Sequence, residues 1–441
     1  MVAGLAGVLG VGTALLVERG GSGRSPHPAS GSTSSTTTVA PPPPAEPAPF
    51  DVQVVELQPF SAVLSWRTAS PTIGQVAVGT PLLGPVRAIR ATPPSRRHAV
   101  PLERLSFGHT FRAWITSTDG EGNSAGATVD LSPPAPSTPL SAAAAGGSIR
   151  LDGKPWFPFL AWGQCSTFYD SGLAAGITLF AHNPCGGLEE QLRGLGGRAL
   201  SAVADGDEGA DGQVVGAFYP DEADAHGVVG AALAPPSSGL AFLTLSNHFY
   251  SGAAALPQGR DMYPGLISHA DVVGFDLYPL QEWCEPDRLA DVEAAQRELV
   301  VLAAGKPTFQ WIEASGMKCP NAPRVEITPA TVRAESWLAI IGGAHGLGFF
   351  PASWTGDVET AIRRVGDEVA VLAPALISHA VPVEVDPSAA RSGVVLDGSR
   401  VRPRRGREHQ SRSGARDASC SRTGRPHVRR RRGVPAHRLD R

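Results

Sequence analysis

Lysine is almost missing from this chain, with three Lys among 441 residues. Basic charge comes from Arg instead, and it is unevenly distributed. Residues 401–441 contain fourteen Arg, no Lys and three acidic residues, a balance of +11, so residues 1–400 carry about −14 and the whole chain −3. An acidic main body lacks the basic surface on which nucleic-acid binding depends. We therefore expect no nucleic-acid partner.

A full membrane-spanning run is also missing from the N-terminus. Residues 2–17 are apolar and uncharged, but about 16 residues are short for a span and typical of the apolar part of a signal peptide. No basic residues precede this run and no clear Ala-x-Ala cleavage site follows it, which a start codon assigned too far downstream would partly explain. We expect residues 1–19 to direct export, so that the protein is secreted or anchored at the extracellular face of the membrane. The alternative is a disordered apolar N-terminus in a cytoplasmic protein.

Cysteine is scarce, and its spacing matches no zinc-binding pattern. Four of the five follow predicted strands of one domain, and neighbouring strand ends lie close together. This favours the disulfides Cys165–Cys185 and Cys284–Cys319, each contributing about 3 kcal/mol to stability. Four separate buried thiols are the alternative. Cys420 lies in the C-terminal tail.

Pro and Ser/Thr-rich stretches divide the chain into segments. Residues 20–49 cannot bury a core and predict an extended linker, which would hold the later domains away from a membrane or cell wall. Residues 134–147 form a second linker. Residues 379–400 begin a β-domain that breaks off where residues 401–441 turn into a disordered Arg-rich tail. This abrupt change suggests a shifted reading frame, and a nucleic-acid-binding tail is the alternative.

Residues 50–133 contain short alternating runs separated by turns, among them 61–66 and 75–79 as separate strands, which predicts an all-β sandwich. The run His98-Ala-Val-Pro-Leu-Glu-Arg-Leu105, the following Gly-His-Thr-Phe and the turn Asp119-Gly-Glu-Gly-Asn123 resemble a fibronectin type III domain. Phe111 stands where that family usually has a corner Tyr, so the hydrogen bond of that corner would be absent. No catalytic constellation is visible here, and we expect a spacer or adhesion role.

Residues 148–378 contain eight short apolar runs. They are 156–162, 176–181, 198–203, 214–219, 240–245, 271–276, 307–312 and 346–350. Continuous rather than alternating runs are typical of parallel strands covered by helices, and helical patterns at 287–303 and 328–341 separate several of them. Eight such units predict a TIM (β/α)8 barrel. The expected fold is therefore multidomain, an all-β sandwich followed by an α/β barrel.

Glu222 and Glu313 follow the fourth and seventh of these runs. Acidic residues at the exits of those two strands can face each other across the mouth of a barrel, as glycosidic bond cleavage requires. We expect Glu222 to be the acid/base, because partial burial and the neighbouring Asp221 would raise its pKa. Glu313 is the expected nucleophile and must stay ionised, helped by a neighbour such as Tyr278.

Four stretches resemble the clan of retaining (β/α)8 glycoside hydrolases that place the acid/base on strand four and the nucleophile on strand seven. They are Phe218-Tyr-Pro-Asp-Glu-Ala-Asp224, Val273-Gly-Phe-Asp-Leu-Tyr-Pro279, Gly305-Lys-Pro-Thr-Phe-Gln-Trp-Ile-Glu313 and the segment 333–350. The resemblance implies the same roles for Glu222 and Glu313. Many members of the clan have Asn before the acid/base, where it contacts the sugar 2-hydroxyl, and this chain has Asp221.

Further residues at the strand exits are expected to bind substrate, because aromatic planes match sugar faces and polar side chains match hydroxyls. They are Trp162, Asp221, Asn247, His248, Asp276, Tyr278, Trp311 and Trp354. The sequence thus predicts an exported, monomeric glycosidase that acts on a poly- or oligosaccharide with retention and without a cofactor.

Two alternatives to a glycosidase remain open. One is a catalytically degenerate barrel that binds cell-wall polysaccharide. The other is a metal-dependent hydrolase, because His182, Asp205, Asp221 and His248 follow neighbouring strands. No His-x-His or His-Glu-x-x-His spacing supports a metal site, and we expect none.

Overall fold

The computed structural model describes residues 47–89, 91–137, 141–203, 212–228, 230, 233–236, 239–316, 326–377, 395–397 and 400–402. The predicted N-terminal export segment, most of the first linker and nearly all of the Arg-rich tail lie outside the described residues. Within the described part of the chain, no helix combines the length and apolar character that crossing a membrane requires. Of the predicted truncated β-domain, the backbone pair β18 (Val395–Asp397) and β19 (Arg400–Arg402) is described.

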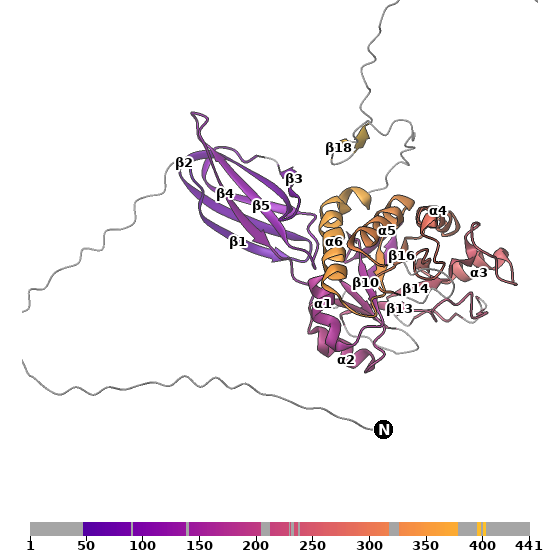
Figure 1. Cartoon of the computed structure of the whole chain (residues 1–441). Coiled ribbons are helices and arrows are strands. Elements are labelled where there is room, and N and C mark those ends of the chain that lie inside the picture. Colours follow the sequence, from indigo (N-terminus) through magenta and orange to yellow (C-terminus); the bar gives the residue numbers. More distant parts are fainter. Residues whose placement is uncertain are drawn as a thin grey trace, which may run out of the picture. The chain divides into compact units, whose positions relative to one another are not determined.

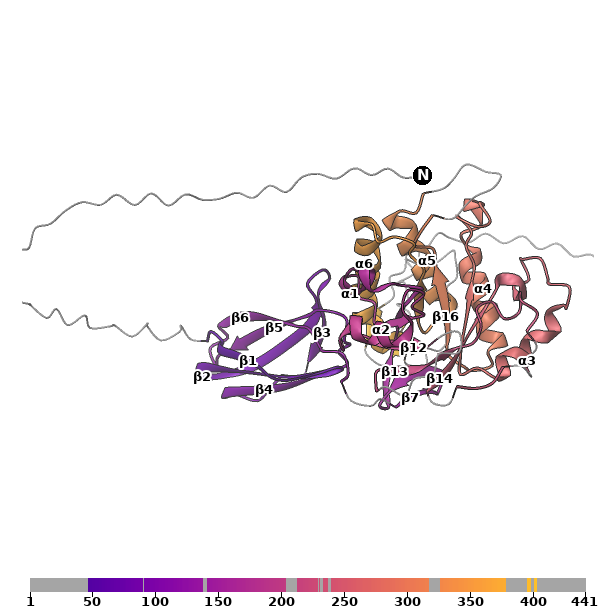
Figure 2. The same ribbon diagram turned by 90° about the horizontal axis from the view of Figure 1, so that it is seen from below.

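The first domain is an antiparallel β-structure built around one long strand. Its strands are β1 (Phe50–Gln58), β2 (Ser61–Thr80), β3 (Gly84–Ile89), β4 (Ser95–Glu103), β5 (Phe111–Thr118) and β6 (Ser124–Leu131). The first half of β2 pairs with β1 and β4, and its second half pairs with β3 and β5. Two runs that the sequence suggested as separate strands, 61–66 and 75–79, are therefore the two halves of β2. Figure 2 shows the layers that result, with β5 and β6 on one side and β4 on the other.

Trp66 centres the core of this domain. It is 1% exposed, its ring stacks on His98 at 4.7 Å, and its indole N–H donates to Ser117 Oγ at 3.1 Å. Phe111 is also buried, in the position where a corner Tyr was considered. The sandwich class is thus confirmed, whereas the fibronectin type III relationship stays a resemblance.

A small antiparallel sheet precedes the barrel. It consists of β7 (Ala142–Ala145), β8 (Ser148–Leu151) and β9 (Lys154–Trp156). Ile149 and Trp156 of this sheet are buried in the same cluster as the side chains that fill the barrel. The structure thus differs from the sequence reading in two places. Residues 142–145 form a strand inside the expected linker, and Pro158, which cannot donate a ladder hydrogen bond, separates β9 from the first barrel strand.

Eight parallel strands close into a barrel, as the sequence predicts (Figure 1). They are β10 (Phe159–Trp162), β11 (Leu179–Ala181), β12 (Leu200–Val203), β13 (Val214–Phe218), β14 (Leu240–Leu245), β15 (Val272–Asp276), β16 (Thr308–Ile312) and β17 (Leu347–Phe349). Each pairs with its neighbour in chain order, and β17 closes against β10. Residues 214–218 and 308–312 are therefore strands four and seven.

Six helices are described outside the barrel strands. They are α1 (Tyr169–Ala174), α2 (Gly187–Leu195), α3 (Tyr263–Ser268), α4 (Asp291–Leu302), α5 (Pro329–Gly342) and α6 (Gly356–Leu376). The predicted start of α5 is confirmed, because Thr328 caps it by accepting from the Thr331 N–H and Pro329 occupies its first position. Helix α5 contacts both α4 and α6 (Figure 1).

Aromatic rings fill the barrel interior. Phe218 stacks on Phe242 at 4.8 Å, and Phe309 lies edge-on to Trp311 at 5.5 Å. Glycine residues on neighbouring strands leave the space that these rings occupy. A Cβ atom on Gly274 would lie 2.2 Å from the Phe309 ring. The barrel interior is therefore a packed core rather than a channel.

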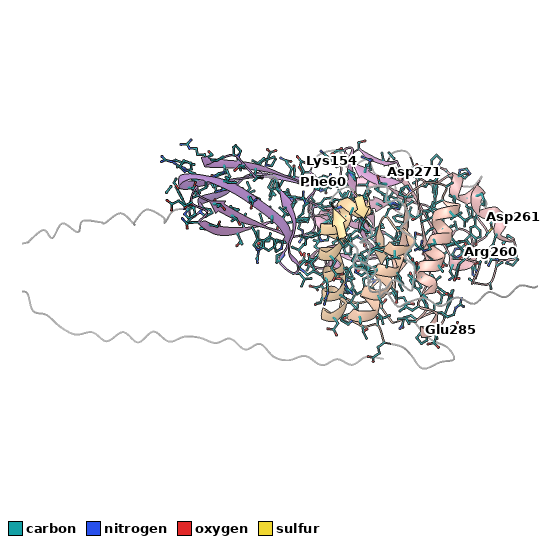
Figure 3. The ribbon with its side chains drawn as sticks, turned by 90° about the horizontal axis from the view of Figure 1, so that it is seen from above. Phe60, Lys154, Arg260, Asp261, Asp271 and Glu285 are labelled. Atoms are coloured by element: carbon teal, nitrogen blue, oxygen red, sulfur yellow. A yellow bond between two sulfur atoms is a disulfide. The ribbon has the colours of Figure 1, made fainter. Side chains whose placement is uncertain are left out.

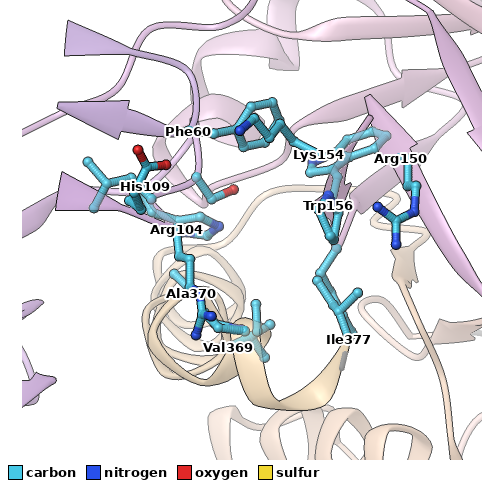
Figure 4. Close-up of a pocket in the computed structure, with 16 residues that line it drawn as sticks. Phe60, Arg104, His109, Arg150, Lys154, Trp156, Val369, Ala370 and Ile377 are labelled. Atoms are coloured by element: carbon cyan, nitrogen blue, oxygen red, sulfur yellow. The ribbon is translucent and has the colours of Figure 1, made fainter. Parts of the chain in front are cut away.

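A cavity of about 520 Å³ lies away from the strand exits (Figure 4). Its lining includes Phe60, Arg104, Lys154, Trp156 and the last turns of α6. Trp156 precedes the first barrel strand, and α6 returns toward the strand starts, so these walls belong to the amino-terminal end of the barrel. Active sites of (β/α)8 barrels form at the opposite end. The predicted catalytic residues are accordingly not among those that line it.

Candidate active site

The loop after β13 is held in place on both sides of Glu222. Tyr219 Oη donates to the His269 carbonyl at 2.9 Å. The buried carboxylate of Asp224 accepts from Ser246 N at 2.8 Å and from Ser246 Oγ at 2.6 Å. These bonds tie the exit of strand four to that of strand five.

Glu222 itself adopts an unusual backbone conformation, with φ at +43°. A non-glycine residue in this left-handed region carries strain of about 1 kcal/mol or more and persists only where the surroundings enforce it. The side chain is half-buried. Burial raises the pKa of its carboxyl group, and the nearby charge of Asp221 raises it further. Both expected causes of a raised pKa are therefore present.

Asp276 ends β15, the sixth strand, and is 9% exposed. Its carboxylate accepts a short hydrogen bond from Tyr278 Oη. Burial raises the pKa of Asp276, the Tyr278 bond opposes this, and the charges of Asp221 and Glu222 add to the rise. Asp276 and Glu222 thus share one electrostatic environment. The expectation that Tyr278 supports Glu313 is not met, because its hydroxyl is engaged with Asp276.

Glu313 follows β16 and is 1% exposed. Its Oε1 accepts from two backbone N–H groups of the loop after β15, Leu280 at 2.9 Å and Gln281 at 3.2 Å. No N–H or hydroxyl group of the described residues donates to its Oε2. Burial raises the pKa of Glu313 to about 7, although the two N–H bonds act in the opposite direction. Burial thus favours the protonated form of Glu313, contrary to the expectation of a fully ionised carboxylate.

Glu335 of α5 is a further member of the site, beyond the residues predicted from sequence. It is 1% exposed, and its Oε2 accepts from the backbone N–H of Glu313 at 3.2 Å. A signal was present in the sequence, because Glu335 shares the buried face of α5 with Val332 and Ala339. An ionisable residue on the apolar face of a helix requires a partner.

The three candidate sugar-stacking Trp residues lie in different environments. Trp162 is partly exposed at the exit of β10 and stacks on His182 at 5.3 Å. Trp311 is 3% exposed inside the barrel, where its indole N–H donates to Thr244 Oγ1 at 3.1 Å. Trp354 donates to Gln164 Oε1 at 2.8 Å and packs against the outer core. Trp162 is therefore the one best placed for a ligand.

Asn247 and His248 lie in the short helix η3 (Asn247–Phe249) after β14. Asn247 is buried, and His248 Nδ1 lies 2.7 Å from the Ala254 carbonyl oxygen. Arg260 clamps this loop by donating to the Phe249 carbonyl at 3.0 Å and to two further carbonyls. Figure 3 shows Arg260 beside Asp261 at the edge of the barrel domain. Arg260 therefore supports the loop rather than a ligand.

One predicted disulfide is described, between Cys165 after β10 and Cys185 after β11, with a Cα–Cα distance of 5.5 Å. Cys284 is also disulfide-bonded. Its predicted partner Cys319 lies outside the described residues, so that pairing stays a prediction. Cys165 and Cys185 both lie on strand-exit loops, so their disulfide fixes the rim of the barrel beside Trp162.

The metal alternative gains no support from the described residues. Among them, no group of three or more His, Cys, Asp or Glu side chains is arranged to hold a metal ion. Asp205, one of the four residues considered, lies outside the described residues.

Comparison with known proteins adds fold neighbours only. No protein-family model matches the chain, and no curated protein does. Among solved structures it is similar to a beta-glucuronidase of Faecalibacterium prausnitzii, at 11% identity over 73% of this chain and 66% of that one, with a TM-score of 0.35. It is also similar to a GH2 beta-galacturonidase of Eisenbergiella tayi bound to galacturonate, at 9% identity over 70% and 69%, with a TM-score of 0.33.

A myokine structure is similar over 20% of this chain and 96% of its own, at 20% identity and a TM-score of 0.18. The two long neighbours are a beta-glucuronidase and a beta-galacturonidase. Such low identities and TM-scores carry no argument about substrate or mechanism, which must come from the residues of this site.

Proposed function

We propose that this protein is a glycoside hydrolase with its active site at the strand exits of the barrel. The observation that carries the proposal is the state of two acids at the exits of strands four and seven. Glu222 is held in a strained backbone conformation, and Glu313 has a buried oxygen to which no N–H or hydroxyl group of the described residues donates. Strain and an unsatisfied buried polar atom both cost stability, and both are typical of functional sites.

In this proposal Glu222 is the general acid that protonates the leaving glycosidic oxygen. Its raised pKa keeps a proton available closer to neutrality than an ordinary Glu would. After the aglycone departs, the same residue removes a proton from the water that completes hydrolysis. Burial and the charge of the neighbouring Asp221 hold this pKa up.

Glu313 is the proposed nucleophile. The Leu280 and Gln281 N–H groups orient Oε1 and leave Oε2 for the bond to the sugar C1. Because Glu313 is 1% exposed, we expect the loop after β15 to shift when substrate binds. Its pKa of about 7 places the start of activity near neutral pH. Retention requires this covalent step.

Trp162 and His182 are the proposed platform for one sugar ring. Their stacked rings offer a flat surface at the exits of strands one and two, which matches the apolar face of a pyranose. Asp221, exposed beside Glu222, is proposed to accept a bond from a sugar hydroxyl. An ionised carboxylate accepts hydrogen bonds but does not donate them, whereas an amide does both. Asp221 would therefore bind sugar hydroxyl groups that donate a hydrogen bond.

The test uses activated and unactivated glycosides with four proteins: wild type, E222Q, E313Q and the surface control E189Q. Glu189 is exposed in the first turn of α2, where it pairs with Arg193 at 3.0 Å. We expect E313Q to lose at least about 10³-fold in kcat and E222Q to retain more activity on substrates with good leaving groups, which need no acid. Equal losses in E189Q, or full activity in E313Q, would refute the proposal. NMR of the first-formed anomer tests retention.

A polysaccharide-binding barrel without catalysis is the second candidate. The burial of Glu313 favours it, because a sealed nucleophile cannot reach a sugar unless the loop after β15 moves. Binding of a glycan panel to wild type and to a Trp162→Ala variant, without turnover in either, would support this candidate over the hydrolase.

We also propose that the protein works outside the cytoplasm. The Cys165–Cys185 bond supports this, because disulfides persist in oxidising compartments. Fractionation of producing cells, with export lost when residues 1–19 are deleted, tests it. Recovery of the intact protein in the cytosol with reduced thiols would contradict it.

A further inference from the structure

Two buried acids meet where β16 ends. Glu313 and Glu335 are each 1% exposed, and they are joined by the 3.2 Å bond from the Glu313 N–H to Glu335 Oε2. No N–H or hydroxyl group of the described residues donates to Oε2 of Glu313 or to Oε1 of Glu335. The two carboxyl groups hydrogen-bond to each other, and burial and the charge of Glu313 raise the pKa of Glu335.

Among the residues that the structure describes, no cation pairs with either acid. Glu282 on the loop after β15 adds a further negative charge near Glu313. On α5 itself, Arg333 is committed to Glu368 of α6, whose two carboxylate oxygens it contacts at 3.0 Å. On α4, Arg297 is paired with Glu293 at 2.8 Å. Two like charges buried together, with no described cation beside them, strongly disfavour each other, so the pair holds at least one proton.

We propose that Glu335 is a positioning residue for Glu313, which it holds by the backbone and with which it shares a single proton. This inference rests on the proposed function of Glu313. The position of the proton decides whether Glu313 can react. When Glu335 carries the proton, Glu313 is the carboxylate and Oε2 is ready for the sugar C1. When Glu313 carries the proton, attack stops.

The shared proton has a measurable consequence without any substrate. A group whose folded pKa is raised stabilises the fold below its unfolded pKa, and that contribution is lost as pH rises through the folded value. Wild-type stability should therefore fall between about pH 5 and 8. Glu335→Gln keeps an oxygen for the Glu313 N–H but removes one ionisable group. We expect the stability of this variant to decrease much less over the same pH range.

Glu368→Gln is the matched control. It breaks a salt bridge on the same helix pair, but Glu368 has a lowered pKa, so its contribution disappears only at acid pH. We expect E368Q to melt at a lower temperature while keeping the wild-type slope between about pH 5 and 8. Should E335Q not fold, E313Q provides the same measurement from the other side of the pair, again with a flattened slope.

Activity supplies the second readout. In Glu335→Ala, which removes the side-chain hydrogen bond that lowers the pKa of Glu313, the limb of the kcat/KM profile that reports ionisation of Glu313 should move to higher pH by about one unit or more. A structural role alone would lower the rate without moving the limb. An unchanged stability slope in both E335Q and E313Q would overturn the shared proton. A flattened slope without turnover on any glycan would uphold the pair and reject the hydrolase.

Discussion

Tyr263 Oη donates to the buried carboxylate of Asp224 at 3.0 Å and joins α3 to the loop that carries Glu222. Asp224 also accepts two bonds from Ser246, so this one side chain connects three segments. A buried carboxylate with three donors is stable only while the donors remain. The position of Glu222 therefore depends on residues that touch no substrate.

Removing the tyrosine hydroxyl should weaken this connection. We expect Tyr263→Phe to lower the free energy of unfolding by about 1–3 kcal/mol, because it removes one hydrogen bond to a charged group. Asp224→Ala removes the acceptor of three bonds and should cost more. Denaturant unfolding of both variants and the wild type provides the measurement. A Tyr263→Phe protein as stable as wild type would contradict the assignment.

Backbone strain at Glu222 should separate stability from activity. Glycine tolerates φ near +43° without penalty, so Glu222→Gly should raise the free energy of unfolding by about 1 kcal/mol while abolishing acid catalysis. Glu222→Gln keeps the strain and should leave stability near wild type. Thermal melts of the two variants side by side provide the measurement. Equal stability of both would show that the conformation carries no strain.

The disulfide between Cys165 and Cys185 should stabilise the barrel rim. It closes a loop over a sequence separation of 20, and the double Ser variant should lose about 3 kcal/mol because its unfolded chain is less restricted. The matched control is Cys420→Ser, which should melt with the wild type. If reduction of the wild type leaves its unfolding midpoint unchanged, the bond makes no contribution.

Glycines on two barrel strands should resist enlargement. A methyl group at Gly348 would lie 2.1 Å from the Trp311 ring, and one at Gly274 would lie 2.2 Å from the Phe309 ring. Each Gly→Ala change should cost about 1–3 kcal/mol or more through overpacking. Gly265 of α3 offers the control, since a Cβ there meets no atom within 4 Å and Ala favours the helix. Chemical denaturation measures the free energy of unfolding of the three variants, and we expect the Gly265→Ala protein to be the most stable of them.

Local patterns predicted most of the barrel. Continuous apolar runs such as 240–245 and 308–312 are strands because parallel strands are buried on both faces, and Thr328-Pro329 begins a helix because it satisfies the first backbone donors. The same logic failed where two runs belong to one element. Nothing local shows that 61–66 and 75–79 continue into each other as β2, since that depends on which strands pair with each half.

The candidate active site, too, was predicted only in part from the sequence. Counting strands from the sequence put Glu222 and Glu313 at the exits of strands four and seven, and the chain order of the closed barrel follows from short right-handed connections. The ionisation of these acids was not contained in their spacing. The pKa of Glu313 depends on burial beneath Leu280 and Gln281, and Tyr278 could be assigned to Asp276 only from coordinates.

The sequence by itself determined the domain classes, the number of barrel strands and the residue types available for chemistry, because these follow from hydrophobic periodicity and chain order. Tertiary structure alone decided which groups are buried together and which protons they hold. Glu335 lies 22 residues beyond Glu313, yet the two interact because a helix packs over the strand that ends beside it. Desolvation and charge act through space, and spacing along the chain does not encode them.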